Sequence, residues 1–187
     1  MYGMINRAVQ GLVLDRHGEE TWARIRTMAK VEETEFLSME QYPDETTYRL
    51  VAASSEVLGV PAEEILEAFG EYWIEYTAEA GYGEIMLAAG RTLPEFLANL
   101  DQLHTRIRFG MPHLRPPSFS VSEAEDGTLT LRYVSERRGL APLVVGLVKG
   151  LARRFGERVD IDRIAERSDE RPYDEFRIVR HAPAEST

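Results

Sequence analysis

The most informative segment of the chain is Leu93-Pro94-Glu95-Phe96-Leu97-Ala98-Asn99-Leu100-Asp101-Gln102-Leu103-His104-Thr105-Arg106-Ile107. Its apolar residues recur every three or four positions, which predicts one helix with one buried face. His104 lies four residues after Leu100 and seven after Leu97, so it shares that face. A neutral imidazole there needs a partner for its nitrogens, either a backbone carbonyl or a metal ion that it ligates.

A second stretch, Thr128 to Arg137, alternates as a strand does. Residues two apart share a face, so Tyr133, Ser135 and Arg137 point the same way, after Leu129 and Leu131. This face passes from apolar side chains to a phenol, a hydroxyl and a guanidinium. Such a surface suits a flat apolar ligand that carries carboxylates at one edge. The alternative is an edge strand whose polar residues are solvated.

Two proline-containing segments separate the helix from the strand. Met111-Pro112 and Arg115-Pro116-Pro117 cannot continue a helix, because proline lacks the amide hydrogen and restricts the residue before it. The fixed ring of Pro117 could press on a ligand as a stiff wedge. It could also simply end one element and orient the next.

The rest of the chain predicts an α+β fold. Helices are expected at Tyr2–Asp15 (ended by His17-Gly18), Glu20–Lys30, Thr46–Leu58, Ala62–Thr77 and Leu140–Phe155. Strands are expected at Ser118–Ser122, Thr128–Glu136, Arg158–Ala165 and Tyr173–Arg180, the first two joined by an Asp126-Gly127 turn. Ala80-Gly81-Tyr82-Gly83 is expected to be a flexible connector.

These elements predict one domain, residues 1–187, in which a helical part packs on a four-stranded antiparallel sheet with helices. The expected subdomains are residues 1–60, approximately, and 61–187. Gly59-Val60-Pro61 separates them, since glycine and proline interrupt helices.

Composition limits the function classes. The net charge of −10 argues against nucleic acid and anionic membrane as partners. There is no long apolar run and no convincing signal peptide, so a soluble cytoplasmic protein is expected. The absence of cysteine excludes disulfides, thiolate chemistry and zinc-thiolate sites.

A histidine on a helix, then Pro-Pro, then Tyr-x-Ser-x-Arg resembles the haem-nitric oxide/oxygen-binding (H-NOX) family, which is related to the haem domain of soluble guanylate cyclase. The resemblance covers essentially the whole chain, from Met1-Tyr2-Gly3-Met4-Ile5-Asn6 to the last strand. Phe69-Gly70-Glu71-Tyr72-Trp73 and Leu114-Arg115-Pro116-Pro117 resemble the stand-alone cyanobacterial-type members most.

The resemblance implies haem b, held between the two subdomains. His104 would be the proximal iron ligand, and Tyr133, Ser135 and Arg137 would bind the two propionates. Pro117 would press on the porphyrin and bend it from planarity. The implied function is a sensor of gases and not an enzyme.

The resemblance also implies which residues select the gas. Oxygen-binding members carry a distal tyrosine five residues after the arginine of the motif, where this chain has Pro142. The expected distal lining is Ile5, Val9, Phe69, Trp73, Leu143 and Leu147. All are apolar except for the indole N–H of Trp73, which is either a donor to the ligand or an ordinary core aromatic. The expected ligands are NO and CO, with O2 excluded.

Signalling is expected to follow release of His104 from the iron, which would free its helix and let the two halves move. The chain ends without kinase, cyclase or chemoreceptor sequence, so a separate effector is expected. The resemblance implies that this partner is a histidine kinase or a diguanylate cyclase/phosphodiesterase.

Three alternatives stay open. They are an O2-binding sensor, a haem enzyme of the peroxidase or oxygenase type, and a module that binds another apolar acid. The enzyme lacks support, because no distal acid–base histidine and no thiolate is evident. His17, His113 and His181 are expected to be solvated.

Overall fold

The computed structural model describes residues 1–181, apart from the side chain of residue 80. The predicted fold class is confirmed, because helices pack on one four-stranded antiparallel sheet. The helices are α1 (Gly3–Met28), α2 (Asp44–Leu58), α3 (Ala62–Thr77), the π-helix η1 (Ala78–Tyr82), α4 (Gly83–Ala89), α5 (Leu93–Ala98), α6 (Leu100–Arg108) and α7 (Ala141–Arg154). The strands are β1 (Ser118–Glu123), β2 (Leu129–Val134), β3 (Arg158–Ala165) and β4 (Asp174–His181).

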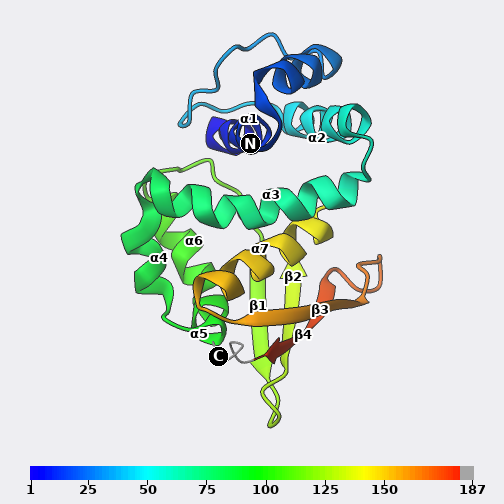
Figure 1. Cartoon of the computed structure of the whole chain (residues 1–187). Coiled ribbons are helices and arrows are strands. Elements are labelled where there is room, and N and C mark those ends of the chain that lie inside the picture. The colour runs from blue at the N-terminus through cyan, green and yellow to red at the C-terminus, as the bar shows by residue number, and fades with distance from the viewer. Residues whose placement is uncertain (182–187) are drawn as a thin grey trace, which may run out of the picture.

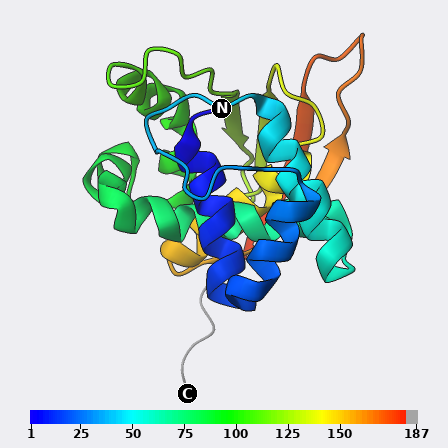
Figure 2. The same ribbon diagram turned by 90° about the horizontal axis from the view of Figure 1, so that it is seen from above.

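The helices and the sheet form successive layers (Figure 1). α1 and α2 lie at one end, α3 and α7 lie in the middle, and the sheet lies beyond α7. Seen from the end of α1 and α2, these two helices lie in front of the middle layer (Figure 2). Within residues 1–181, no helix combines the length and the apolar character needed to span a membrane.

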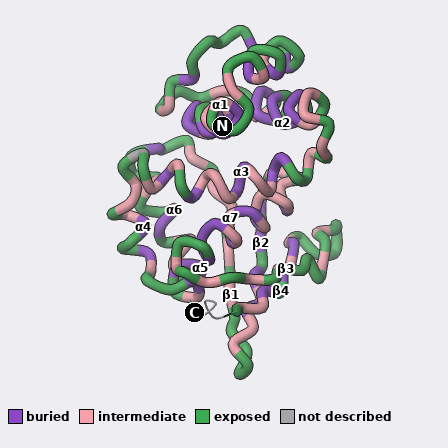
Figure 3. The backbone as a smooth tube through the Cα atoms, viewed as in Figure 1, coloured by how far each residue is buried: buried purple, intermediate pink, exposed green. Residues whose placement is uncertain are grey.

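The sheet has the order β1-β2-β4-β3, with every neighbouring pair antiparallel. Leu129, Leu131 and Tyr133 alternate along β2 and are all buried, as the period of two requires. Buried residues gather between α1 and α2 and again around α7 and β2 (Figure 3). β2 therefore runs through the larger core and ends next to the motif residues Ser135 and Arg137.

Glycine sets the contact between α3 and α7. A Cβ atom built on Gly70 would lie 2.3 Å from the Leu143 carbonyl oxygen, and one on Gly146 would lie 1.9 Å from that of Glu67. Both distances are far inside van der Waals contact, so only glycine permits this approach of the two backbones. The two helices thus form one closely packed layer between α1–α2 and the sheet.

Three predicted elements differ from the observed ones. The two predicted N-terminal helices form one run, α1, interrupted at Gly18 (φ 80°, ψ 174°), so the predicted break is confirmed but the chain resumes its helix at once. The flexible connector predicted at residues 80–83 is wrong, since η1 and α4 occupy this region and Gly81 adopts φ 93°. The single predicted helix over residues 93–107 is two helices, α5 and α6, which meet at Asn99.

Asn99 lies at the break, with φ −98° and ψ 3°. Its side-chain amide donates to the Ala89 carbonyl at 2.8 Å, while its backbone keeps hydrogen bonds to Glu95 and Leu103. α6 starts afresh at Leu100 and carries His104 in its middle. The subdomain boundary near residue 60 stays a prediction.

Candidate functional site

A cavity of about 1260 Å³ lies between the N-terminal helices, the α3–α7 layer and the sheet-side elements. Five predicted site residues line it: His104 from α6, Pro117 from the segment before β1, and Tyr133, Ser135 and Arg137 from β2 and the turn after it. Residues scattered over more than thirty positions of the chain therefore meet at one site. The volume exceeds that of most small-ligand pockets, so a large ligand fits it.

Five of the six residues expected on the distal side also line the cavity, namely Ile5, Phe69, Trp73, Leu143 and Leu147. Val9 does not line it. It is buried in the core of the N-terminal helices, because its position on α1 faces that core. Sequence reasoning missed further apolar lining residues, among them Met1, Tyr2, Leu66, Leu100, Leu103 and Leu140. Helical spacing around His104 could have indicated Leu100 and Leu103, whereas nothing in the sequence pointed to Met1.

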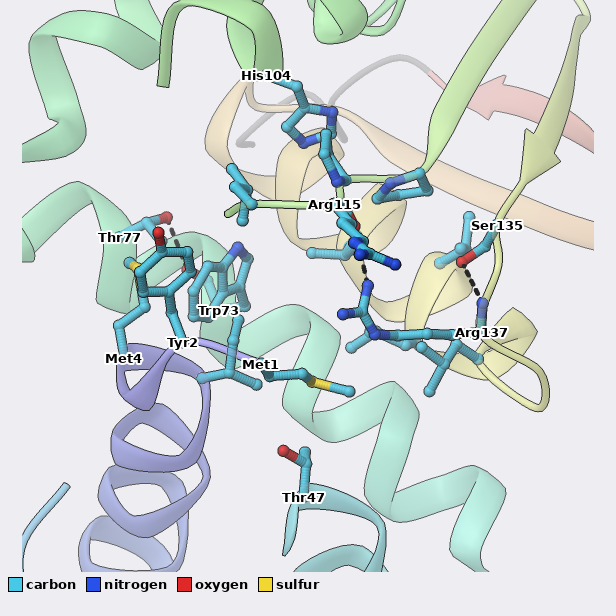
Figure 4. A pocket seen from close by; sticks show the side chains of 18 of the residues that line it. Met1, Tyr2, Met4, Thr47, Trp73, Thr77, His104, Arg115, Ser135 and Arg137 are labelled. Carbon is cyan, nitrogen blue, oxygen red and sulfur yellow. Dashed lines mark hydrogen bonds between the residues drawn. The ribbon is translucent and has the colours of Figure 1, made fainter. Parts of the chain in front are cut away.

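His104 is a largely buried imidazole whose Nδ1 has no hydrogen-bond partner within residues 1–181. Burial lowers its pKa below the ordinary value, against opposing contributions from Asp101 and the Pro117 backbone, which lies near the ring without forming a hydrogen bond of ordinary geometry. The side chain is directed toward the cavity (Figure 4). A neutral imidazole that faces a cavity is the form that ligates a metal ion.

Asp101 ties α6 to the start of β1. Its carboxylate accepts hydrogen bonds from Ser118 Oγ at 2.5 Å and from the Phe119 amide at 2.8 Å. Ser118 follows Pro117 directly, so the same contact holds Pro117 in place relative to His104. Nothing in the sequence indicated this role, because Asp101 resembles any other acid on a solvated helix face.

The polar end of the cavity holds donors suited to carboxylates (Figure 4). Tyr133 is buried, and burial raises the pKa of its phenol, against a smaller opposing hydrogen bond with Ser135, so the phenol keeps its proton and can donate it. Ser135 Oγ accepts a hydrogen bond from the Arg137 amide at 3.1 Å. A phenol, a hydroxyl and a guanidinium thus lie around one end of a mainly apolar cavity.

Arg137 also bridges two distant parts of the chain. Its Nε donates to Asp44 Oδ2 at 2.7 Å and its Nη1 donates to the Arg115 carbonyl at 2.9 Å. Asp44 begins α2 and also contacts the Met1 ammonium at 2.6 Å. Burial alone would raise the pKa of Asp44, but the bonds and charges of Arg137 and of the ammonium outweigh it and lower the pKa. Sequence reasoning missed this ion pair, whose partners are 93 positions apart.

The three other histidines are all exposed, unlike His104. His17 is exposed and lies in α1 directly before the interruption at Gly18. His181 pairs with Asp160 at 2.7 Å on the sheet. His113 is exposed at the rim of the cavity, where its backbone amide donates to the Tyr2 hydroxyl at 3.3 Å. Their exposed positions agree with the expectation that they are solvated.

The residues present fit a haem. The cavity is large and mainly apolar, a neutral histidine faces it from one side, and donors for carboxylates lie at one end. The Pro117 backbone lies near the His104 ring, and a carbonyl contact at one ring nitrogen is compatible with ligation of a metal ion through the other.

Comparisons with known proteins also point to a haem-binding domain. The family model described as "Haem-NO-binding" matches residues 2–163. The chain is 39% identical over 173 residues to soluble guanylate cyclase gcy-35 of Caenorhabditis elegans, covering 91% of this chain and 25% of that protein. It is 32% identical over 126 residues to guanylate cyclase soluble subunit beta-2 of Rattus norvegicus, covering 64% of this chain and 18% of that protein. The chain thus spans about a quarter or less of the length of these relatives.

Solved structures have the same fold. An H-NOX protein from S. oneidensis in the Fe(II)NO ligation state superposes with a TM-score of 0.86 at 18% identity, covering 97% of this chain and 99% of that one. An Fe(II) unliganded H-NOX protein from K. algicida gives a TM-score of 0.82 at 21% identity, with both chains fully covered. At these identities the likeness shows the fold alone.

Proposed function

Because this chain belongs to the haem-NO-binding, or H-NOX, family, a family of haem-based gas sensors, we propose that it senses NO through haem b. In this proposal His104 ligates the iron, and Tyr133, Ser135 and Arg137 bind the two propionates. The observation that carries it is one cavity of about 1260 Å³ that His104 and all three motif residues line.

A bound ferrous haem, held by His104, would supply an iron atom able to bind a diatomic gas. The chain's part begins with His104, whose position in α6 fixes where the iron sits. Pro117 lies on the same side of the cavity, and its rigid ring is proposed to press on the porphyrin. Asp101 keeps α6 and Pro117 together, so these two contacts act on the haem as one unit.

The apolar lining supports selectivity for NO and CO over O2. Hydrogen-bond donors on the distal side are a main means by which a haem protein favours O2. Ile5, Phe69 and Leu143 offer none. Pro142, at the position of the distal tyrosine, has neither a phenol nor an amide hydrogen and does not line the cavity. We therefore propose that O2 is excluded.

An O2-binding sensor is the second candidate, and Trp73 is the observation that favours it. Its indole lines the cavity and carries a donor. Its ring packs edge-on against Phe69 at 6.1 Å and stacks on Tyr76 at 6.0 Å. These contacts are typical of a core aromatic residue, so we favour the NO-selective sensor over the O2-binding one.

Signalling is proposed to start when His104 releases the iron. Free of that bond, α6 no longer has a fixed position relative to the cavity. The Asp44–Arg137 ion pair joins α2 to the carboxylate-binding turn, so a shift at either place alters the other. The proposed receiver is a separate effector protein, such as a histidine kinase or a diguanylate cyclase/phosphodiesterase. In this proposal the chain has no catalytic activity of its own.

The test is one set of absorption spectra of the haem-loaded protein in its ferrous, air-exposed and NO-treated forms. The proposal expects spectral changes with NO and CO and no stable spectrum of an O2 complex in air. It also expects the NO-treated spectrum to show loss of the His104 bond. A stable O2 spectrum would favour the second candidate, and a chain that takes up no haem would favour a module for another apolar acid.

A further inference from the structure

The turn that carries Ser135 and Arg137 depends on contacts from elsewhere for its shape. β2 ends at Val134 and α7 begins at Ala141, so the residues between them lack the bonds of a strand or a helix. Inside the turn, the Arg137 amide donates to Ser135 Oγ. Two further bonds come from the loop between β3 and β4, which is far from the turn in sequence.

Arg167 supplies these bonds. Its Nη1 donates to the Ser135 carbonyl at 2.6 Å and to the Arg137 carbonyl at 3.2 Å. One charged nitrogen therefore joins the backbone on both sides of Glu136. Bonds from a charged donor are stronger than those between neutral groups, so this contact fixes the separation of the two carbonyls firmly.

The position of Arg167 is itself fixed. Its backbone amide donates to Asp174 Oδ1 at 3.0 Å, and Arg163 Nε donates to the same oxygen at 2.9 Å. Asp174 is 4% exposed and pairs across the sheet with Tyr133. Arg167 is half-buried in a loop whose neighbouring residues Glu166 and Ser168 are exposed, so it does not behave as a solvated loop arginine.

We propose that Arg167 is a positioning residue for the haem carboxylates. Arg167 does not line the cavity, so it acts through the backbone of Ser135 and Arg137, whose side chains do. It holds these side chains at a fixed separation before the ligand arrives, which lowers the cost of ordering them on binding. This inference rests on the proposed function, and nothing in the sequence pattern alone indicated it.

Linkage requires the effect to run in both directions. If the contact from Arg167 strengthens the grip on the haem, then bound haem must stabilise that contact and the loop that provides it by the same free energy. Haem loading should therefore slow amide hydrogen exchange over residues 166–173 as well as in the turn. In Arg167→Ala this protection of the loop should disappear.

The first measurement is the rate at which the loaded protein loses haem to an excess of apomyoglobin. Arg167→Ala should release haem about tenfold faster, because coupling between two linked contacts typically changes affinity by about 5- to 150-fold. Arg167→Lys keeps the charge and a donor, so its rate of haem release should lie between those of the wild type and Arg167→Ala. Arg171→Ala is the matched control, because Arg171 is an exposed arginine of the same loop, and its rate should equal that of the wild type.

The second measurement uses the haem-free protein. Arg167→Ala should speed hydrogen exchange at the amides of residues 135–140, whereas Arg171→Ala should leave it unchanged. Equal release rates and equal exchange in all variants would overturn the positioning role while leaving haem binding intact. If the wild type takes up no haem, the proposed function fails, and the exchange data still decide whether Arg167 orders the turn. Should Arg167→Ala not fold, the graded effect of Arg167→Lys against the Arg171→Ala control decides both measurements.

Discussion

The two walls of the cavity are built in different ways. The sheet-side wall, defined by His104, Pro117, Tyr133, Ser135 and Arg137, is fixed by polar contacts to Asp101, Asp44 and Arg167. The helix-side wall, defined by Ile5, Phe69, Trp73, Leu143 and Leu147, is shaped by apolar packing and by the α3–α7 glycine contact. Directional bonds suit a wall that must grip one ligand, and packing suits a wall that must exclude water and polar groups.

His104→Gly should produce the largest effect, because it removes the only side chain of the sheet-side wall proposed to bond the iron. The spectrum of the loaded protein should lose its histidine-ligated form, and added imidazole should restore it. His113→Gly is the matched control and should leave the spectrum unchanged, since His113 is exposed at the rim. A His104→Gly protein with an unchanged spectrum would contradict the assignment of the sheet-side wall.

Gly146→Ala tests the helix-side wall. The added Cβ would meet the Glu67 carbonyl at 1.9 Å, so α3 and α7 must separate. Overpacking of this kind should lower the free energy of unfolding by about 3 kcal/mol. Urea unfolding of the haem-free protein measures it. Gly110→Ala is the control, because its Cβ would meet only the Ile107 carbonyl at 3.8 Å. Equal losses in the two variants would show that the helix contact does not matter.

Asp44→Asn breaks the ion pair that joins the N-terminal helices to the sheet-side wall. The ion pair is partly exposed and salt screens it. The substitution should therefore lower the free energy of unfolding by about 1 kcal/mol near neutral pH. The pKa of Asp44 is lower in the folded chain than its ordinary value of 3.8. The ionised carboxylate therefore stabilises the fold fully at pH values above 3.8. This stabilisation should vanish as the pH falls through the lowered pKa.

Urea unfolding of the wild type, Asp44→Asn and Glu45→Gln over that pH range tests the ion pair. Glu45 is the exposed neighbour of Asp44 on α2 and should matter little. A gap between wild type and Asp44→Asn that persisted well below pH 3.8 would mean that Asp44 acts otherwise than through its charge.

Trp73→Phe should have the smallest effect. It removes the indole donor from the helix-side wall and keeps an aromatic ring. If the wall selects by its apolar character, NO and CO spectra should be unchanged and neither protein should hold O2 in air. A wild type that holds O2, together with a Trp73→Phe protein that does not, would instead make Trp73 a polar member of this wall.

Periodicity in the sequence predicted most of the fold. α3 and β3 have the predicted bounds, and the predicted α7 differs by one residue at each end. The errors lie at helix boundaries. α5 ends at Asn99, which has φ −98° and ψ 3°, although the apolar spacing continues through the break. α4 was missed because Gly81 and Gly83 indicate a loop, although the helix resumes between them and Gly90.

The site was predictable to the extent that its residues share a motif. Spacing places Tyr133, Ser135 and Arg137 on one strand face and His104 on an apolar helix face, but it left open a solvated strand and a core histidine. The resemblance to the family is what assigned these four residues to a haem site. Asp44 and Arg167 reach the motif across the fold, and an isolated sequence holds no signal for such pairs. Val9 was predicted to line the site but does not. It lies one helical turn after Ile5 on α1, yet it is buried in the core of the N-terminal helices.

The size of the cavity bears on how the chain responds to hydrostatic pressure. Unfolding removes internal empty space, and pressure favours whichever state has the smaller volume. The cavity of about 1260 Å³ is partly open to solvent, so only the part that water fills poorly counts as empty space. Because of that part, the haem-free chain should unfold at lower pressure than the loaded chain. Pressure would then distinguish an empty interior from a filled one without any optical signal from the ligand.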